Sequence, residues 1–253
     1  MEKKDALYTY CLRLADNSLV LGNRLSEWCG HGPFLEEDLA LTNIALDKIG
    51  QSRTLYQYAC EIEGKGKTED DLAYKRSERE FYNTLLAEQP NGDFAVTIVR
   101  EFLNDHLDLL VYEKLTESND PVLKAFGEKS IKELQYHIRH VDQWILRLGD
   151  GTDESHQRMK DALQLLWPFT GELFEKDEVD AMLVKEGIAP DVSALKEQWH
   201  KAVQEVLNEA TLDMPEDAWM HTGGKREGRH SEHLGYMLAQ MQFLPRAYPD
   251  AKW

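Results

Sequence analysis

The sequence has little positive charge and no long apolar run. Of its 253 residues, 29 are Lys or Arg and 46 are Asp or Glu, so the formal net charge is -17. Binding to nucleic acid or to an anionic membrane needs a concentrated positive surface, which this composition does not supply. The first residues are charged but are not followed by an apolar segment, and no later run could span a bilayer. We therefore expect a cytoplasmic protein.

Cysteine is also scarce. Cys11, Cys29 and Cys60 are the three cysteines, and they lie far apart in the sequence. This scatter excludes both a disulfide framework and a Cys-x-x-Cys metal site. A dinucleotide fingerprint, a phosphate-binding loop and a G-x-S-x-G motif are missing as well. Any chemistry must therefore come from polar side chains within the regular elements.

Helical periodicity dominates the rest of the chain. Apolar or small residues recur at spacings of three and four from Leu7 to Trp28, and Gly30-His31-Gly32-Pro33 ends the pattern. Thr68 is placed to cap a short helix, and no alternation typical of strands has useful length. The pattern predicts long helices over 7–30, 35–62, 93–117 and 118–149, followed by helices over 154–175, 178–186, 192–210 and 231–246.

Four long helical segments joined by breaks are typical of a helical bundle. We expect an all-α protein with one domain over residues 1–253. Residues 1–150 would form the core bundle and residues 151–220 accessory helices. Residues 221–253 would form a Gly-rich basic loop with a C-terminal helix and tail.

The stretch K-E-L-Q-Y-H, Lys132 to His137, nearly matches an iron-binding motif. Bundles that hold two irons use one Glu from each of two helices and a Glu-x-x-His from each of the other two. Residues at i and i+3 share a helix face, so both can reach one ion. Here the residue three places before His137 is Leu134, and Glu133 lies one place too early.

Helical projection places few metal ligands in the bundle interior. Lys48 lies in line with the apolar stripe of its helix, with Gln51 at the edge, and Asp105 flanks the stripe of another helix. An ammonium group offers no lone pair to a metal. We infer that Lys48 takes the place of metal, and a buried Lys48 could pair with Asp105 and hold the helices in register. Two alternatives stay open, namely a Lys48 that extends to the surface and a reduced metal site at Glu133 and His137.

The segment T-G-G-K-R-E-G-R-H, Thr222 to His230, combines glycines with basic side chains. Its backbone amides could hold an anion such as a phosphate, with Lys225, Arg226 and Arg229 as candidate contacts. The alternative is a solvated loop. The letters Glu227-Gly-Arg-His230 do not indicate a metal site, because they stand in a glycine-rich loop.

Several stretches resemble the C subunits of the bacterial phenylacetyl-CoA epoxidase (phenylacetate-CoA oxygenase) family. The most specific is R-L-S-E-W-C-G-H-G-P-F-L-E-E-D-L-A-L-T-N-I-A-L-D-K-I-G-Q-S-R, Arg24 to Arg53. The likeness extends over nearly the whole chain, through residues 88–92, 132–137, 148–152 and the tail from Thr222.

The resemblance implies a ferritin-like four-helix bundle with additional C-terminal helices, and a non-catalytic structural role. In this family the C subunit pairs with a catalytic A subunit that holds a di-iron centre. The complex inserts one oxygen atom into the aromatic ring of phenylacetyl-CoA, in aerobic phenylacetate degradation. A B subunit and a reductase with NADPH, flavin and iron–sulfur groups complete it. The chain itself would hold no cofactor, and a homodimer of the chain alone stays open.

Matching the catalytic subunit's iron motifs onto this chain implies a vestigial di-iron site. The first Glu-x-x-His falls on Lys48 and Gln51, and the second falls on Leu134 and His137. Asp105 matches a carboxylate ligand, and the first-helix ligand falls near Asn17. We expect no catalytic, cofactor-binding or metal-binding residue among these positions. The alternatives are a di-iron oxygenase or oxidase with a reduced metal site, and a CoA- or anion-binding module of the complex.

Overall fold

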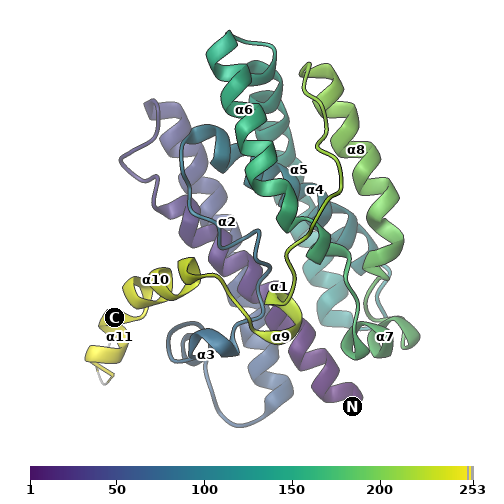
Figure 1. Ribbon diagram of the computed structural model, residues 1–253. Coiled ribbons are helices and arrows are strands. Elements are labelled where there is room, and N and C mark those ends of the chain that lie inside the picture. The colour runs from purple at the N-terminus through teal and green to yellow at the C-terminus, as the bar shows by residue number, and fades with distance from the viewer. Residues whose placement is uncertain (250, 252–253) are drawn as a thin grey trace.

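The computed structural model describes residues 1–249 and 251, and this part of the chain is helical and contains no strand (Figure 1). None of its helices is long and apolar enough to cross a membrane. The α-helices are α1 (Lys3–Ser26), α2 (Leu35–Glu63), α3 (Glu69–Tyr74), α4 (Phe94–Leu115), α5 (Pro121–Gly149), α6 (Asp153–Leu166), α7 (Glu178–Lys185), α8 (Lys196–Glu209), α9 (Gly224–Glu227), α10 (Glu232–Met241) and α11 (Phe243–Ala247). Short 3-10 helices are η1 (Glu78–Glu80), η2 (Trp167–Phe169), η3 (Gly171–Phe174) and η4 (Val192–Leu195).

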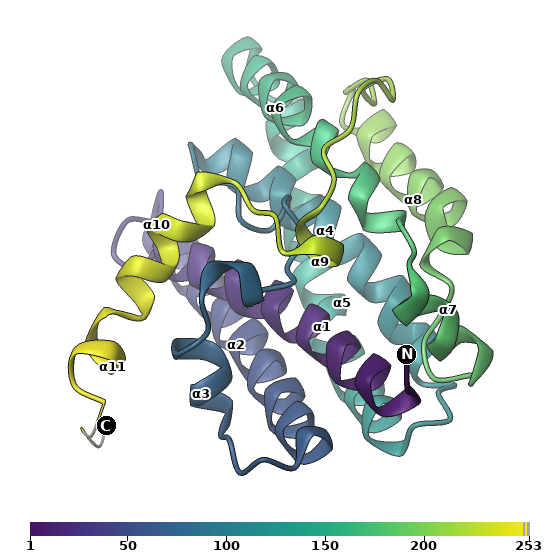
Figure 2. The ribbon, with the colours of Figure 1, turned by 60° about the horizontal axis from the view of Figure 1, so that its bottom comes forward.

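Helices α1, α2, α4 and α5 form the predicted bundle. Helices α1 and α2 pack along each other, as do α4 and α5, and the two pairs meet through α2 and α5 (Figures 1 and 2). Their facing sides are apolar and form one large buried core. The prediction of four long helices is confirmed.

Local sequence signals set where the long helices begin and end. The carboxylate of Asp93 accepts a hydrogen bond from the Val96 amide and caps α4. Asp120 does the same for α5, where Pro121 takes the first helical position. Gly64, in the left-handed conformation with φ of 72°, ends α2. These boundaries agree with the predicted ones within a few residues.

Helices α6 and α8 cover α4 and α5, and α7 packs on α1. The indole rings of Trp167 and Trp199 fill the space beneath this layer, 5.7 Å apart between ring centres. The helix predicted over 154–175 is wrong in its extent, since α6 ends at Leu166 and two 3-10 turns follow. Pro168 explains the difference, because proline lacks the amide hydrogen that a continuing α-helix would need.

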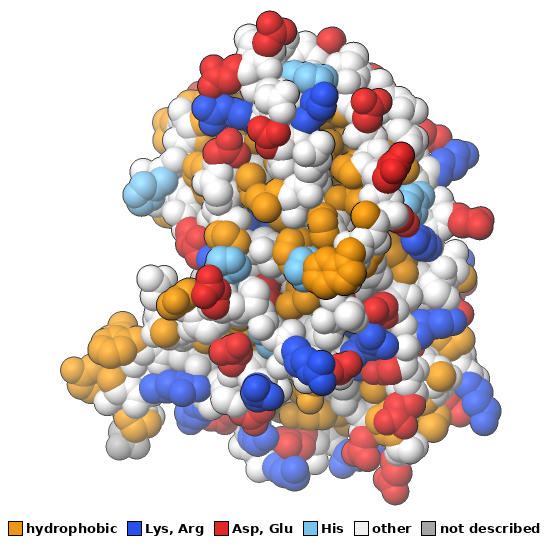
Figure 3. Space-filling view, viewed as in Figure 1, with side chains coloured by type: hydrophobic (Ala, Val, Ile, Leu, Met, Phe, Trp, Pro, Cys, Tyr) orange, Lys and Arg blue, Asp and Glu red, His pale blue; other side chains and the backbone are white. Residues whose placement is uncertain are grey.

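The chain then returns along the surface to an arm formed by α10 and α11. Figures 1 and 2 show this arm projecting from the bundle, and apolar side chains gather at its outer end in Figure 3. The helix predicted over 231–246 is two helices that meet at Gln242. The buried Gln242 amide donates to the carbonyl oxygens of Ala73 and Arg76 at 3.1 and 3.0 Å, which anchors the arm to the α3 region.

Candidate functional site

A buried charge cluster lies between α2 and α4. The Nζ of Lys48 donates a hydrogen bond to Oδ1 of Asp105 at 2.6 Å. The same Nζ lies 3.5 Å from Oε2 of Glu101, and all three side chains are almost completely buried. The predicted pairing of Lys48 with Asp105 is confirmed, and the alternative of a surface-directed Lys48 is wrong.

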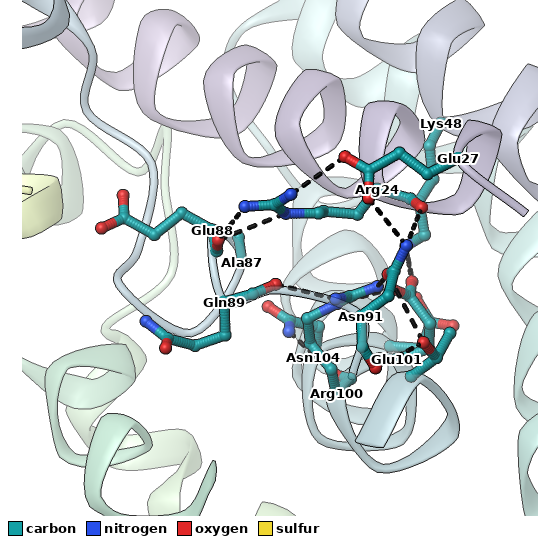
Figure 4. Close-up of polar contacts among 12 residues, drawn as sticks. Arg24, Glu27, Lys48, Ala87, Glu88, Gln89, Asn91, Arg100, Glu101 and Asn104 are labelled. Atoms are coloured by element: carbon teal, nitrogen blue, oxygen red, sulfur yellow. Dashed lines mark hydrogen bonds and ion pairs between the residues drawn. The ribbon is translucent and has the colours of Figure 1, made fainter. Parts of the chain in front are cut away.

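Glu101 is a member of this cluster that sequence reasoning missed. It lies on α4 one turn before Asp105, and its Oε1 accepts from Nε of Arg100 at 3.3 Å. Arg100 in turn donates to the carbonyl oxygen of Gln89 and to Oδ1 of Asn91, at 2.9 and 2.8 Å (Figure 4). The spacing of four from Asp105 would have placed Glu101 on the same helix face. Glu101 therefore lies between two buried cations.

The cluster changes the proton affinities of its members. Burial by itself lowers the pKa of Lys48, but Asp105 and Glu101 outweigh burial and hold this pKa above its ordinary value. Burial raises the pKa of Glu101 although Lys48 and Arg100 oppose it. Burial also raises the pKa of Asp108, one turn further along α4, to about 7, against the charge of Lys48 and with help from Asp105 and Glu101. Lys48 therefore stays charged, whereas Asp108 binds a proton near neutral pH.

Other polar residues at the positions that match the iron motifs are hydrogen-bonded to groups outside the Lys48 cluster. Nε2 of Gln51 donates to Oε2 of Glu133 at 2.9 Å, and Nε2 of His137 lies 3.0 Å from Oδ2 of Asp47. Leu134 is fully buried in the apolar core. These pairs cross the contact between α2 and α5 and hold the register of the two helices.

Asn17 of α1 does not take part in the Lys48 cluster and contacts Thr84 instead. Its Oδ1 accepts from the backbone amide and the hydroxyl of Thr84, at 3.1 and 2.8 Å. Asn17 lines a cavity of about 70 Å³, together with Asp108 and Lys225. The structure thus joins Lys48 with Asp105, and it directs Asn17, Gln51 and His137 to other groups.

The side chains between α2 and α4 do not fit a di-iron centre. Such a centre needs four carboxylates and two histidines around the metals, and here an ammonium group donates to Asp105 where a ligand would bind metal. Among residues 1–249 and 251, no group of three His, Cys, Asp or Glu side chains is arranged to hold a metal ion.

In the segment from Thr222 to His230, the basic side chains already contact groups of this chain, namely carboxylates for Arg226 and Arg229 and a backbone carbonyl oxygen for Lys225. The Lys225 amide donates to Oε1 of Glu172 at 2.7 Å, and its buried Nζ donates to the Leu173 carbonyl oxygen at 3.1 Å. Arg226 pairs with Glu175 at 2.6 Å. Arg229 pairs with Glu227 at 3.0 Å. An external anion would have to compete with these carboxylates.

The same segment ends in a buried ion pair that sequence reasoning missed. Oε2 of Glu88 lies 2.7 Å from Nδ1 of His230, and Oε1 accepts from the Ser231 amide at 2.6 Å. The Glu88 carbonyl oxygen accepts from Arg24 of α1 at 2.7 Å (Figure 4). Burial lowers the pKa of His230, but Glu88 outweighs burial and raises it above its ordinary value. Glu88 therefore ties the C-terminal segment to α1.

Two comparisons place this arrangement among known proteins. A family described as "Phenylacetic acid catabolic protein" matches residues 1–253. The chain is 51% identical, over 247 residues, to the C subunit of the 1,2-phenylacetyl-CoA epoxidase of Escherichia coli strain K12. That match covers 98% of this chain and 99% of the relative.

Proposed function

Since the chain belongs to the phenylacetic acid catabolic protein family, we propose that it is a non-catalytic structural subunit of a phenylacetyl-CoA ring epoxidase. It would support a catalytic A subunit that holds the di-iron centre, in the cytoplasm. A B subunit and an NADPH-dependent reductase would complete the complex, as the family resemblance implies. The chain itself contributes neither metal nor redox cofactor.

The single observation that carries this proposal is the hydrogen bond between Lys48 and Asp105. A fixed ammonium group supplies inside the bundle the positive charge that metal ions supply in a catalytic relative. It is held by two carboxylates, because the buried Glu101 lies 3.5 Å away. Metal binding would require expulsion of this ammonium group from a buried site, which electrostatic repulsion opposes.

The alternative of a metal-dependent oxygenase with a reduced site lacks a comparable observation. His137 contacts Asp47, and Glu133 contacts Gln51, so the two residues of the near-motif engage separate partners. The CoA- or anion-binding alternative rests on Lys225, Arg226 and Arg229. Charge reversal at Arg226 and Arg229 tests it, because loss of a phosphate contact would raise KM for phenylacetyl-CoA and leave kcat unchanged.

The deciding experiment combines metal analysis with reconstitution. The purified chain is loaded with ferrous iron and its iron content is measured, and the purified catalytic subunit is then assayed with and without the chain. We expect near-zero iron in the chain, and phenylacetyl-CoA epoxidation only when both subunits and the reductase are present. Lys48→Met in this chain should leave the kcat of the complex within about twofold, because Lys48 touches no reacting group.

Two results would contradict the proposal. About two irons per chain, the content of a di-iron bundle, would make this chain an oxygenase candidate. Full activity of the catalytic subunit without the chain would remove the structural role.

A further inference from the structure

Helix α2 carries a stripe of exposed apolar side chains on the side away from the bundle. Leu35, Leu39, Leu46 and Ile49 are 70%, 55%, 61% and 38% exposed. At 100° per residue they fall within about 80° of the helix circumference, so they form one line along the helix, with Thr42 between Leu39 and Leu46. The line is about 21 Å long, at 1.5 Å per residue. We call these four residues the α2 stripe.

The opposite side of α2 is already buried in the bundle. Leu41, Ile44, Ala45 and Leu55 face the core and are almost fully buried. A surface helix normally has one apolar side and one polar side, and a helix that is apolar on two sides is normally buried on both. A contiguous exposed apolar surface of this kind marks a protein–protein contact. The bundle accounts for one apolar side of α2. It leaves Leu35, Leu39 and Leu46 uncovered, and covers Ile49 only in part, through Gly22 of α1.

Gly50 gives a second, independent indication. It lies in the interior of α2, one turn after Leu46, and a Cβ atom built on it would meet no atom within 4 Å. Glycine destabilises a helix interior relative to alanine, so its presence there normally serves a close approach. Nothing in the described part of this chain approaches Gly50. Close approach of another backbone would explain a glycine at this point.

We propose that the α2 stripe is the surface on which the catalytic subunit of the epoxidase docks, through one of its own helices laid along α2. This inference rests on the proposed function. A straight apolar line with a glycine beside it fits an α-helix, because small residues let two helix backbones pack closely.

The net charge of -17 argues against a second copy of this chain as the occupant, because two copies would repel each other. The exposed carboxylate of Glu36 beside the stripe favours an occupant with basic residues around its apolar line.

Further along α2, on the side that faces α5, a groove opens between the two helices. This groove has a volume of about 390 Å³ and is lined by Gln51 and Thr54 of α2 and by Val122 and Ala125 of α5. Stable interfaces cover about 800 Å² on each partner, which is more than a single line of side chains provides. The catalytic partner must therefore contact more of this chain than the α2 stripe, and the groove offers apolar side chains of a second helix, α5.

The test uses purified full-length chains and measures the Kd for the purified catalytic subunit by sedimentation or interferometry. Leu46→Glu should weaken binding at least about 30-fold, because it places a carboxylate at the centre of an apolar contact. Gly50→Leu should weaken it as well, by blocking the approach of the partner helix. The matched control is Leu165→Glu on α6, since Leu165 is 58% exposed and Leu46 is 61% exposed. The control should leave Kd within about twofold, as expected for a surface change outside a contact.

The outcomes separate this inference from the proposed function. Failure of the unmodified chain to bind the catalytic subunit would overturn both. If Leu46→Glu has the circular dichroism spectrum of the unmodified chain and both bind the catalytic subunit equally well, the docking role of the α2 stripe alone would be overturned. Loss of self-association in Leu46→Glu without loss of heteromeric binding would assign the stripe to a homodimer and would also overturn the inference.

Discussion

Two buried carboxylates of this bundle are compensated by cations but differ in how fully they are hydrogen-bonded. Asp16 of α1 accepts from Nη1 of Arg76 at 3.1 Å and from the Tyr82 amide at 2.7 Å. It also accepts from the Tyr56 hydroxyl and from Nη2 of Arg76. Both carboxylate oxygens of Asp16 thus receive two donors.

Asp105 is just as deeply buried but receives one donor, from Lys48. Its Oδ2 and the Oε2 of Glu101 have no hydrogen-bond donor among the described residues. A fully satisfied buried network stabilises a fold, whereas a partly satisfied one adds little or weakens it. The comparison indicates that Asp16 serves folding. The Lys48 cluster, by contrast, balances buried charge but leaves two of its acceptor oxygens without a donor from the described part of the chain.

Asp16→Ala tests this comparison most directly, and we expect it to cause the largest loss of stability. It leaves the buried guanidinium of Arg76 without its carboxylate, which typically costs about 3–5 kcal/mol of unfolding free energy. Urea unfolding followed by circular dichroism measures the loss, with Asp5→Ala in the exposed first turn of α1 as the control. A loss no greater than that of the control would show that Arg76 finds another partner.

Asp105→Ala should lower the free energy of unfolding by about 2–3 kcal/mol, which is less than the loss for Asp16→Ala. The reason is that Glu101 stays beside Lys48 and keeps part of the charge compensation. The double variant Lys48→Met/Asp105→Leu removes both charges and should recover most of that loss. The same unfolding experiment measures both variants. If the double variant is as unstable as Asp105→Ala, the buried pair contributes more to stability than its incomplete hydrogen bonding suggests.

Asp108→Asn tests the third carboxylate through pH. The pKa of Asp108 is about 7 in the folded chain and about 3.9 in an unfolded one. The folded state therefore binds more protons between these values, and the unmodified chain loses stability as pH rises from about 4 to 7. Asn cannot ionise, so the variant should gain about 1–2 kcal/mol over the unmodified chain at pH 8, and nothing at pH 4. This gain is smaller than the full difference between the two pKa values would give, because the carboxyl group is only half-buried and borders a cavity.

Melting temperatures between pH 4 and pH 8 measure this difference, with Glu113→Gln on the exposed side of α4 as the charge-matched control. A stability difference that does not vary with pH would show that Asp108 keeps an ordinary pKa.

Gly50→Ala should have the smallest effect on the isolated chain and should be favourable. Alanine stabilises a helix interior relative to glycine by about 0.5–1 kcal/mol, and the added methyl group has open space. Thermal unfolding of the free chain measures this gain. A loss of stability would mean that α2 needs glycine for its own conformation, and would weaken the argument for the α2 stripe.

The sequence was sufficient to predict the four long helices because their signals are local. The caps Asp93 and Asp120 and the glycine at residue 64 lie within a few residues of the boundaries they set. The buried pairing of Lys48 with Asp105 could also be anticipated, since Lys48 lies within the apolar stripe of its helix and Asp105 flanks that of another.

Other features depend on contacts between distant parts of the chain. Glu88 and His230 are 142 positions apart, and neither has a periodic pattern around it. Glu101 was missed for a different reason, because a carboxylate next to Arg100 looks like an ordinary surface ion pair until the fold buries both. The break of the C-terminal helix at Gln242 depends on carbonyl oxygens offered by residues 73 and 76. No local signal at Gln242 indicates them.

The contacts between Glu88 and residues 230–231 also constrain the order in which parts of the chain can finish folding during synthesis. Glu88 leaves the ribosome long before His230 and the Ser231 amide exist, so a nascent chain of bundle length carries a buried carboxylate without these donors. The four long helices can associate cotranslationally, but the loop around Glu88 can reach its final state only after the later segment arrives.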